Sequence, residues 1–123
     1  MTGNSISKKI KSFGHAIRGV FVFMKSNPHN GVLVFSLIAV IAAGFYFNIN
    51  QAEWFAVIIV TGLVFVAEAF NTAIEIHMNL TSPEHHPFAR DTKDVAAGAS
   101  LLAVILSAVV GLVVFLPRIM ELF

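Results

Sequence analysis

Three long runs without a charged residue constrain this chain more than any other feature of its sequence. The runs cover residues 31–47, 54–67 and 95–116. A helix rises 1.5 Å per residue, so about 20 apolar residues cross a hydrocarbon core about 30 Å thick. In addition, 57% of the residues are hydrophobic and only 12% are charged, far from the composition of a soluble domain. The sequence therefore predicts an all-α membrane protein with three transmembrane helices.

The segment before the first run predicts a different kind of helix. Its apolar residues recur at helical spacing, whereas Lys8, Lys11, His15 and Arg18 occupy the other side. A basic amphipathic helix before a span is expected to lie in the membrane interface, and a solvated arm is the alternative. We therefore expect one domain over residues 1–123, with a surface helix at 5–26 and membrane helices at 31–48, 53–80 and 88–117. Pro117 is expected to end the last helix.

The distribution of cations orients the predicted spans. Seven of the eight Lys and Arg residues precede the first span or lie between the second and third. By the positive-inside rule, these segments are cytoplasmic, and so is the N-terminus. Arg118, beyond the last span, is the exception. The sequence thus predicts a multi-pass protein of the cytoplasmic membrane.

Several functional classes are excluded by what the sequence lacks. Without cysteine, the chain has no disulfide, thiolate nucleophile or cysteine-based metal site. Its net charge of +1 gives no basis for nucleic-acid binding. It contains neither a Walker loop nor the protein-kinase signature motifs. If the protein uses ATP, the nucleotide site must be assembled from helix faces.

A stripe of polar residues follows the second apolar run. Glu68, Asn71, Glu75 and Asn79 are spaced so that all four fall on one face of a helix. Ionisable side chains at membrane depth cost on the order of 3 kcal/mol each and usually face a bundle interior or a watery cavity. With Trp54 at the outer boundary, Glu68 lies about 21 Å inward and Glu75 about 31 Å inward. A site at this edge could meet a water-soluble anion and a lipid headgroup together.

These residue types meet the minimum needs of phosphoryl transfer. Glu75 and Asp94, on successive helices, offer the carboxylate oxygens that Mg²⁺ prefers. Glu68, which is deeper and less solvated, is suited to accept a proton from a hydroxyl. Lys93 supplies a positive charge where a phosphate would lie. The neutral donors and acceptors beside these groups are Asn71 and Asn79.

Two other interpretations fit the same spacing. Glu75 and Asp94 could pair with Arg90 or Lys93 as interface salt bridges, which would make the chain a structural membrane protein. Glu68 could instead be the carrier carboxylate of a small proton- or cation-coupled transporter. A transporter would account for Glu68, but it would not account for the charged residues gathered at one edge.

Three stretches of the sequence match one known family. They are Glu68-Ala-Phe-Asn-Thr-Ala-Ile-Glu75, the turn Ser-Pro-Glu-His-His-Pro at residues 82–87, and Lys93-Asp-Val-Ala-Ala-Gly-Ala99. With these stretches the chain resembles the prokaryotic integral-membrane diacylglycerol kinases, a family that includes the undecaprenol kinases, over nearly its whole length. The resemblance implies a homotrimer in the bacterial inner membrane whose active sites are shared between neighbours. The implied reaction transfers the γ-phosphate of MgATP to the hydroxyl of diacylglycerol or undecaprenol at the cytoplasmic face.

The resemblance also implies roles for single residues. Glu68 matches the catalytic base, and Glu75 matches a metal ligand that also contacts the nucleotide. The other implied nucleotide-binding residues are Asn71, Asn79, Lys93 and Asp94.

Two positions depart from the family pattern. Asn27 stands where the family commonly has an acidic residue that assists the metal, and Asn79 stands where an Asp is common. An amide still offers a carbonyl oxygen, so we expect a competent site with weaker Mg²⁺ binding. A degenerate, inactive family member is the alternative.

Overall fold

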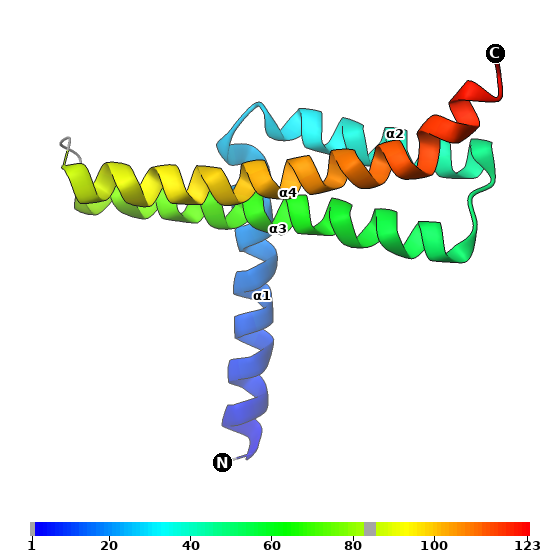
Figure 1. Cartoon of the computed structure of the whole chain (residues 1–123). Helices are drawn as coiled ribbons and strands as arrows, with labels where there is room; N and C mark the ends of the chain where they lie inside the picture. Colours follow the sequence, from blue (N-terminus) through cyan, green and yellow to red (C-terminus); the bar gives the residue numbers. More distant parts are fainter. Residues whose placement is uncertain (1, 83–85) are drawn as a thin grey trace. The chain divides into compact units, whose positions relative to one another are not determined.

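The computed structural model describes residues 2–82 and 86–123. These residues form four helices and no strand: α1 (Thr2–Ser26), α2 (Asn30–Phe47), α3 (Gln51–Thr81) and α4 (Pro87–Met120) (Figure 1). The last three helices are long and apolar enough to cross a membrane. The expected all-helical class with three candidate spans is therefore confirmed. The predicted turn at residues 82–87 falls partly outside the described residues, because residues 83–85 are not among them.

The chain divides into two compact units, and residues 2–32 belong to the first. At the end of α1, the carbonyl oxygen of Phe23 accepts hydrogen bonds from Ser26 Oγ and Asn30 Nδ2, both at 2.6 Å. Asn27 Oδ1 accepts the backbone N–H of His29 at 2.9 Å. Such bonds satisfy backbone groups that helix ends leave unpaired. These bonds lie between the end of α1 and the start of α2.

The apolar side chains along α1 are exposed. They include Ile6, Ile10, Phe13, Ile17 and Phe21. A row of exposed apolar residues opposite the cations is what an interfacial helix needs. The placement of α1 in a membrane interface remains a prediction.

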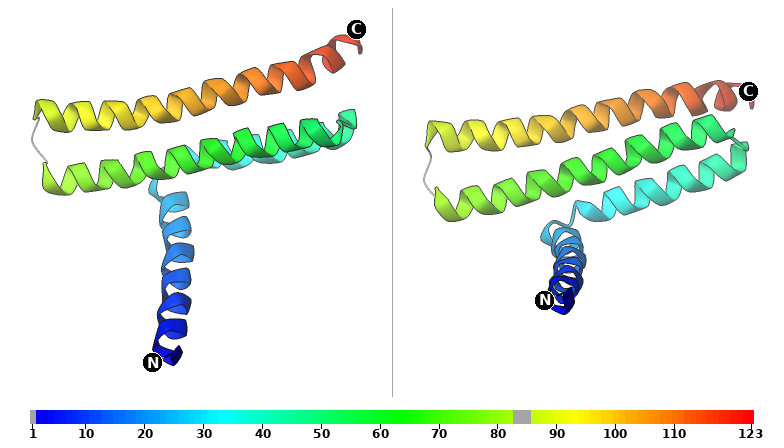
Figure 2. Two further views of the ribbon diagram at one scale, coloured as in Figure 1. Left: turned by 60° about the horizontal axis from the view of Figure 1, so that its bottom comes forward. Right: turned by 90° about the horizontal axis from the view of Figure 1, so that it is seen from below.

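Helices α3 and α4 pack antiparallel in the second unit, Leu33–Phe123 (Figure 2). The buried residues are Val57, Val60 and Val64 on α3, and Ala96, Ser100, Ala103 and Val114 on α4. Apart from the step of eleven residues from Ala103 to Val114, they are three or four residues apart, which is typical of helices that pack along a common seam. Small residues dominate the α4 side of this seam, so the two backbones approach closely.

Helix α2 contacts the other two helices through a small apolar core. The centre of this core is formed by Ile49, which follows α2, together with Val57 and Val114. Val40 and Phe47 of α2 pack against it. Gly44 faces Trp54 so closely that a Cβ at position 44 would overlap the indole ring. The same ring packs against Phe45, with 5.1 Å between ring centroids. Phe45 and Trp54, together with other residues of α2 and α3, line an apolar cavity of about 730 Å³.

Helix α4 does not end at Pro117, contrary to the expectation from the sequence. It continues to Met120. Proline lacks an N–H group and therefore removes one hydrogen bond from the helix. However, Arg118 Nη1 donates to the carbonyl oxygen of Val114 at 2.6 Å. The carbonyl oxygen that loses its partner at Pro117 is that of Val113, so the bond of Arg118 is an additional one at the next carbonyl.

Candidate functional site

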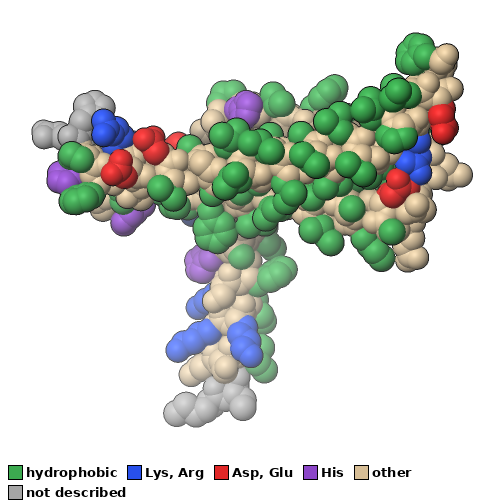
Figure 3. All heavy atoms as spheres, viewed as in Figure 1, with side chains coloured by type: hydrophobic (Ala, Val, Ile, Leu, Met, Phe, Trp, Pro, Cys, Tyr) green, Lys and Arg blue, Asp and Glu red, His purple; other side chains and the backbone are tan. Residues whose placement is uncertain are grey.

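Acidic and basic side chains gather where α3 ends and α4 begins (Figure 3). Lys93 Nζ donates to Asn79 Oδ1 at 2.5 Å, which joins the two helices directly. Lys93 is half-buried, whereas Asn79, Glu75 and Asp94 are exposed. The structure thus brings together the lysine and one amide of the predicted site, with two carboxylates at the same end of the helix pair.

Glu68 and Asn71 lie deeper along α3, toward its apolar part. Both residues are half-buried. Asn71 follows Val64 by seven residues, which is one full repeat of the spacing that buries residues against α4. Accordingly, Asn71 Oδ1 is buried, and it has no hydrogen-bond partner within residues 2–82 and 86–123. The predicted stripe is therefore not uniform, because Asn71 is half-buried with its Oδ1 buried, whereas Glu75 and Asn79 are exposed.

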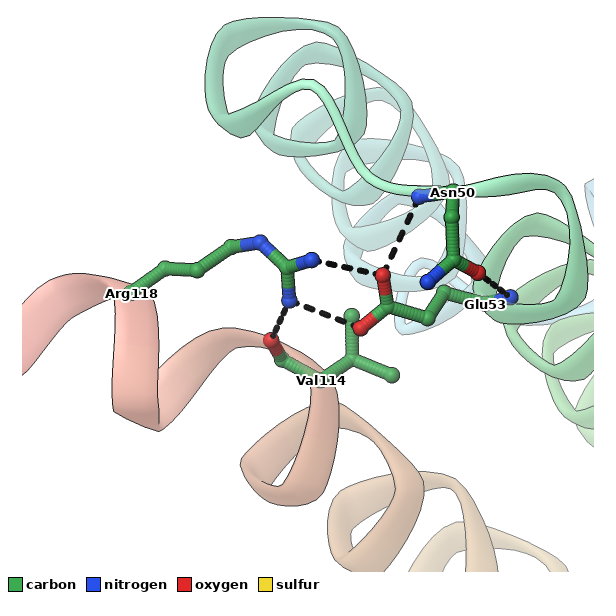
Figure 4. Close-up of polar contacts among 4 residues, drawn as sticks. All are labelled: Asn50, Glu53, Val114 and Arg118. Carbon is green, nitrogen blue, oxygen red and sulfur yellow. Dashed lines mark hydrogen bonds and ion pairs between the residues drawn. The ribbon is translucent and has the colours of Figure 1, made fainter.

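A second polar contact joins α3 and α4 at the opposite end of the unit. Arg118 Nη1 donates to Glu53 Oε2 at 2.7 Å, and Arg118 Nη2 donates to Glu53 Oε1 at 2.6 Å (Figure 4). From the rise of a helix, Glu53 and Asn79 are separated by about 39 Å along α3, and Lys93 and Arg118 by about 38 Å along α4. Because the two contacts enclose nearly equal lengths, the two helices stay in register along their whole shared length.

Glu53 also completes a capping box at the start of α3. Its backbone N–H donates to Asn50 Oδ1 at 2.9 Å, and the Asn50 N–H donates to Glu53 Oε1 at 3.0 Å (Figure 4). The expectations from the sequence did not include this cap, although the Asn-x-x-Glu spacing signals it. The ion pair with Arg118 has no comparable local signal, because 65 residues separate its partners.

The side-chain oxygen of Asn27 already accepts a hydrogen bond within the first unit. The family resemblance puts Asn27 at a metal-assisting position, but its Oδ1 accepts the N–H of His29. An amide oxygen in such a turn serves the backbone. The structure therefore shows Asn27 in a local backbone contact, and its role beside a metal stays a prediction.

The carboxylates of the second unit suit a metal that arrives with a nucleotide. Among the described residues, no three Asp, Glu, His or Cys side chains form a cluster that could hold a metal. Glu75 and Asp94 lie exposed at one end of the helix pair. Mg²⁺ is usually bound by one or two carboxylates, with water and substrate phosphates as the other ligands. The two carboxylates fit such a shared metal and do not form a self-contained metal centre.

Comparisons with known proteins agree with the sequence resemblance. The family model for prokaryotic diacylglycerol kinase matches residues 14–115. The undecaprenol kinase of Bacillus subtilis is 34% identical over 115 residues, which cover 94% of each chain. A diacylglycerol kinase of Synechocystis is 32% identical over 112 residues, 90% of this chain and 64% of its own length. One from Helicobacter pylori is 25% identical over 113 residues, 85% of this chain and 88% of its own.

No solved structure matches the chain. The family model nevertheless spans all of α2 and α3 and most of α4, and every predicted site residue lies within the matched range. The chain therefore belongs to the prokaryotic diacylglycerol kinase family and is a lipid kinase.

Proposed function

We propose that this lipid kinase transfers the γ-phosphate of ATP to the hydroxyl of a membrane lipid at the cytoplasmic edge of the bilayer. The observation that carries the proposal is the contact of Lys93 with Asn79, which holds an ammonium group at the polar end of α3 and α4. A fixed cation beside neutral hydrogen-bonding groups is suited to bind phosphate oxygens. Asn71 and the exposed carboxylates of Glu75 and Asp94 complete the nucleotide site.

The same carboxylates are the proposed metal ligands. Glu75 and Asp94 would hold Mg²⁺ together with phosphate oxygens of the nucleotide. When bound, the metal neutralises charge on the phosphates during transfer. Asn79 is neutral, so it holds Lys93 without cancelling the positive charge of the ammonium group.

Glu68 is the proposed base. It lies seven residues before Glu75, about 10.5 Å along the helix axis toward the apolar part of α3. A lipid hydroxyl would reach this level from the membrane, while the nucleotide enters from water. Glu68 accepts the hydroxyl proton as the hydroxyl oxygen bonds to the γ-phosphorus and the bond from that phosphorus to ADP breaks.

Undecaprenol is the first candidate acceptor, and diacylglycerol is the second. The preference rests on the relative from Bacillus subtilis, which is named an undecaprenol kinase and matches 94% of both chains. The relatives named diacylglycerol kinase match with lower identity. We further propose a homotrimer in the bacterial inner membrane with its N-terminus in the cytoplasm, supported by the family resemblance and by the distribution of cations.

The test is transfer of labelled γ-phosphate from MgATP by the purified protein in mixed micelles, with undecaprenol and diacylglycerol as separate acceptors. We expect label in undecaprenol, and a loss of about 100-fold or more in Glu68→Gln, because a base typically contributes that much. Glu121→Gln is the matched control, since Glu121 is exposed beyond the end of α4. Full activity in Glu68→Gln would exclude Glu68 as the base. Transfer to diacylglycerol alone would reverse the order of acceptors.

A further inference from the structure

We infer that the apolar cavity between α2 and α3 is a groove that binds the hydrocarbon tail of the acceptor lipid, namely the single prenyl chain of a polyprenol such as undecaprenol. The inference rests on the proposed function, in which the hydroxyl of that lipid meets Glu68. The groove is lined from residues 37–66, and all of the sequence motifs follow this range. The evidence is what lines the groove and where it leads.

The lining of the groove suits a hydrocarbon chain. Its wall on α2 lies within residues 37–45, and its wall on α3 lies within residues 54–66. Apart from Thr61 and Gly62, every lining residue has an aliphatic or aromatic side chain. Apolar cavities stay free of water and bind apolar molecules. The volume of about 730 Å³ falls within the range of ligand sites, about 300–1,000 Å³.

The groove exists because α2 stands away from α3. The two helices run side by side (Figure 2), yet they bring no pair of Cα atoms within 8 Å, as α3 and α4 do. At the outer end, the indole of Trp54 reaches across to Gly44 and Phe45 of α2. Phe45 and Ile58, which line the groove, are exposed, so the groove is open along its side. A chain can therefore enter from the surrounding bilayer, and Trp54 marks the outer limit.

The inner end of the groove leads to the proposed base. Four lining residues of α3 follow one another at steps of four, three and four: Trp54, Ile58, Thr61 and Phe65. Glu68 comes three residues later, and residues with this spacing lie on one face of a helix. The last lining residue of α3 precedes Glu68 by two positions, about 3 Å along the helix axis. A chain in the groove therefore brings its terminal hydroxyl to the level of Glu68.

The length of the groove favours a prenyl chain over an acyl chain. From Glu68 to Trp54, α3 extends about 21 Å. A lipid tail of one leaflet spans half of the hydrocarbon core, about 15 Å, so an acyl chain that begins at Glu68 ends before Trp54. The chain of undecaprenol is longer than the whole groove and can fill it. A polyprenol also has one chain, whereas diacylglycerol has two, of which the second would stay in the bilayer.

The groove positions the acceptor and does not extract it from the membrane. Lipid tails are as apolar as the lining, so entry into the groove gains no hydrophobic free energy. The gain comes from packing contacts and from a fixed position of the hydroxyl beside Glu68, which accelerates the reaction. We therefore expect kcat/KM for prenyl alcohols to rise with chain length until the chain reaches Trp54.

The kinetic test compares Gly62→Phe with Gly111→Phe, using MgATP with prenol, farnesol or undecaprenol in mixed micelles. Both glycines have open space around an added Cβ, but only Gly62 lines the groove. Gly62 lies about 14 Å along α3 from Glu53, and Gly111 lies at a similar depth, about 11 Å along α4 from Arg118.

The readout is the ratio of kcat/KM for undecaprenol to that for prenol. Gly62 is about 9 Å along α3 from Glu68, beyond the reach of the single isoprene unit of prenol. We expect the ratio to fall about tenfold in Gly62→Phe, since misplacement of the reacting group can cost that much. It should stay the same in Gly111→Phe. An unchanged ratio in Gly62→Phe, or an equal fall in both variants, would overturn the inference.

A photolabelling test does not depend on activity. The probe is a polyprenol with a diazirine in its tail, and labelled residues are located by mass spectrometry. Label should fall on both walls, within residues 37–45 and 54–66, and excess undecaprenol should displace it. Leu102 and Val113 of α4 are exposed and lie outside the groove, so label there should not be displaced. Saturable label in the groove of a protein that phosphorylates no alcohol would support the groove and reject the proposed function.

Three outcomes of the labelling would overturn the inference. Label that undecaprenol displaces from neither wall would identify ordinary bilayer lipid as the occupant. Equal displacement by diacylglycerol would show that the groove accepts any lipid tail and does not select a prenyl chain. An absence of label from both walls, with label on α4, would show that a second copy of the chain covers the groove.

Discussion

Arg118 holds both carboxylate oxygens of Glu53, at 2.6 and 2.7 Å, across a separation of 65 residues in the sequence. At the other end of the same two helices, Lys93 bonds to Asn79. The distance of about 39 Å along α3 between Glu53 and Asn79 exceeds the thickness of a hydrocarbon core, about 30 Å. Each polar contact can therefore meet a membrane surface, while the residues buried between them are mainly small or apolar.

Removing the charge of Glu53 should lower stability without affecting ATP binding. In Glu53→Gln an amide oxygen can still accept the Asn50 N–H, so the capping box persists while the ion pair with Arg118 is lost. We expect a lower midpoint of thermal unfolding in micelles. The deficit should shrink as salt rises, because the partly exposed ion pair of the unchanged protein is screened by salt. KM for ATP should stay the same, since the proposed site lies at the other end of α3.

Glu121→Gln is the control for this experiment. It makes the same chemical change at an exposed position after α4. Its unfolding midpoint should equal that of the unchanged protein at all salt concentrations. An equal midpoint in Glu53→Gln would show that the ion pair makes no net contribution to stability, as is found for many surface pairs.

A methyl group at position 44 should disturb the packing of α2 against Trp54. Gly44→Ala places a Cβ where it overlaps the indole ring, and such overpacking costs about 1–3 kcal/mol. Trp54 is the only tryptophan in the chain, so its fluorescence reports on this contact. We expect a shifted emission maximum and a lower unfolding midpoint. Gly111→Ala, with open space around its Cβ, should leave the emission maximum in place and should raise the unfolding midpoint slightly, because alanine is a better helix former than glycine.

A compensating variant separates this contact from a general effect on α2. If the indole is the obstacle, Trp54→Phe should make room for the added methyl group. The loss of stability caused by Gly44→Ala should then be smaller in the Trp54→Phe background than in the unchanged protein. An equal loss in both backgrounds would place the conflict elsewhere in α2.

The helices could be predicted from the sequence because a bilayer demands long uncharged runs, which are a strong local signal. The end of α4 could not be predicted in this way. Pro117 usually stops a helix, but the contact of Arg118 with the Val114 carbonyl, and its bonds to Glu53, accompany a further turn. Glu53 lies in a different helix from Arg118, so no local pattern reveals this pairing.

The residue types of the candidate site could be predicted from the sequence, but the burial of each side chain could not. Glu68, Asn71, Glu75 and Asn79 are separated by three, four and four residues, which is a longer average spacing than that of the seam. The seam between α3 and α4 follows a repeat of about 3.5 residues. A stripe with the longer period moves around the helix relative to the seam. This drift is consistent with Asn71 being held against α4 while Glu75 is exposed. Asn79, near the end of α3, is exposed but still contacts Lys93 of α4.

Lys93 and Asn79 should affect ATP use to different degrees. Lys93→Met removes the cation, and we expect kcat/KM for ATP to fall about 10- to 100-fold, the range for hydrogen bonds to charged groups. Asn79→Ala leaves the charge but releases the ammonium group from its partner, so a fall of about three- to tenfold is expected. Initial rates at varied ATP and saturating lipid would measure both. Equal losses in the two variants would mean that Asn79 contacts the nucleotide directly and does more than hold Lys93.

The two exposed carboxylates should control the Mg²⁺ requirement. Glu75→Gln and Asp94→Asn each remove one charged oxygen ligand from the proposed shared metal site, and an amide is a weaker ligand for Mg²⁺. We expect the Mg²⁺ concentration for half-maximal rate to rise roughly tenfold in each variant, equivalent to about 1.4 kcal/mol of binding free energy. Titration of activity with Mg²⁺ at fixed ATP provides the measurement.

Asp91→Asn supplies the control for the metal experiment, since Asp91 is an exposed carboxylate in the first turns of α4 outside the proposed site. Its Mg²⁺ titration should match that of the unchanged protein. If Asp91→Asn shifted the curve as far as Asp94→Asn, the effect would come from the overall charge at this end of the helices, which attracts cations without binding them in a defined place. A shift confined to Glu75→Gln and Asp94→Asn, and persisting at high salt, would instead identify both as ligands, because direct coordination is screened far less than long-range attraction.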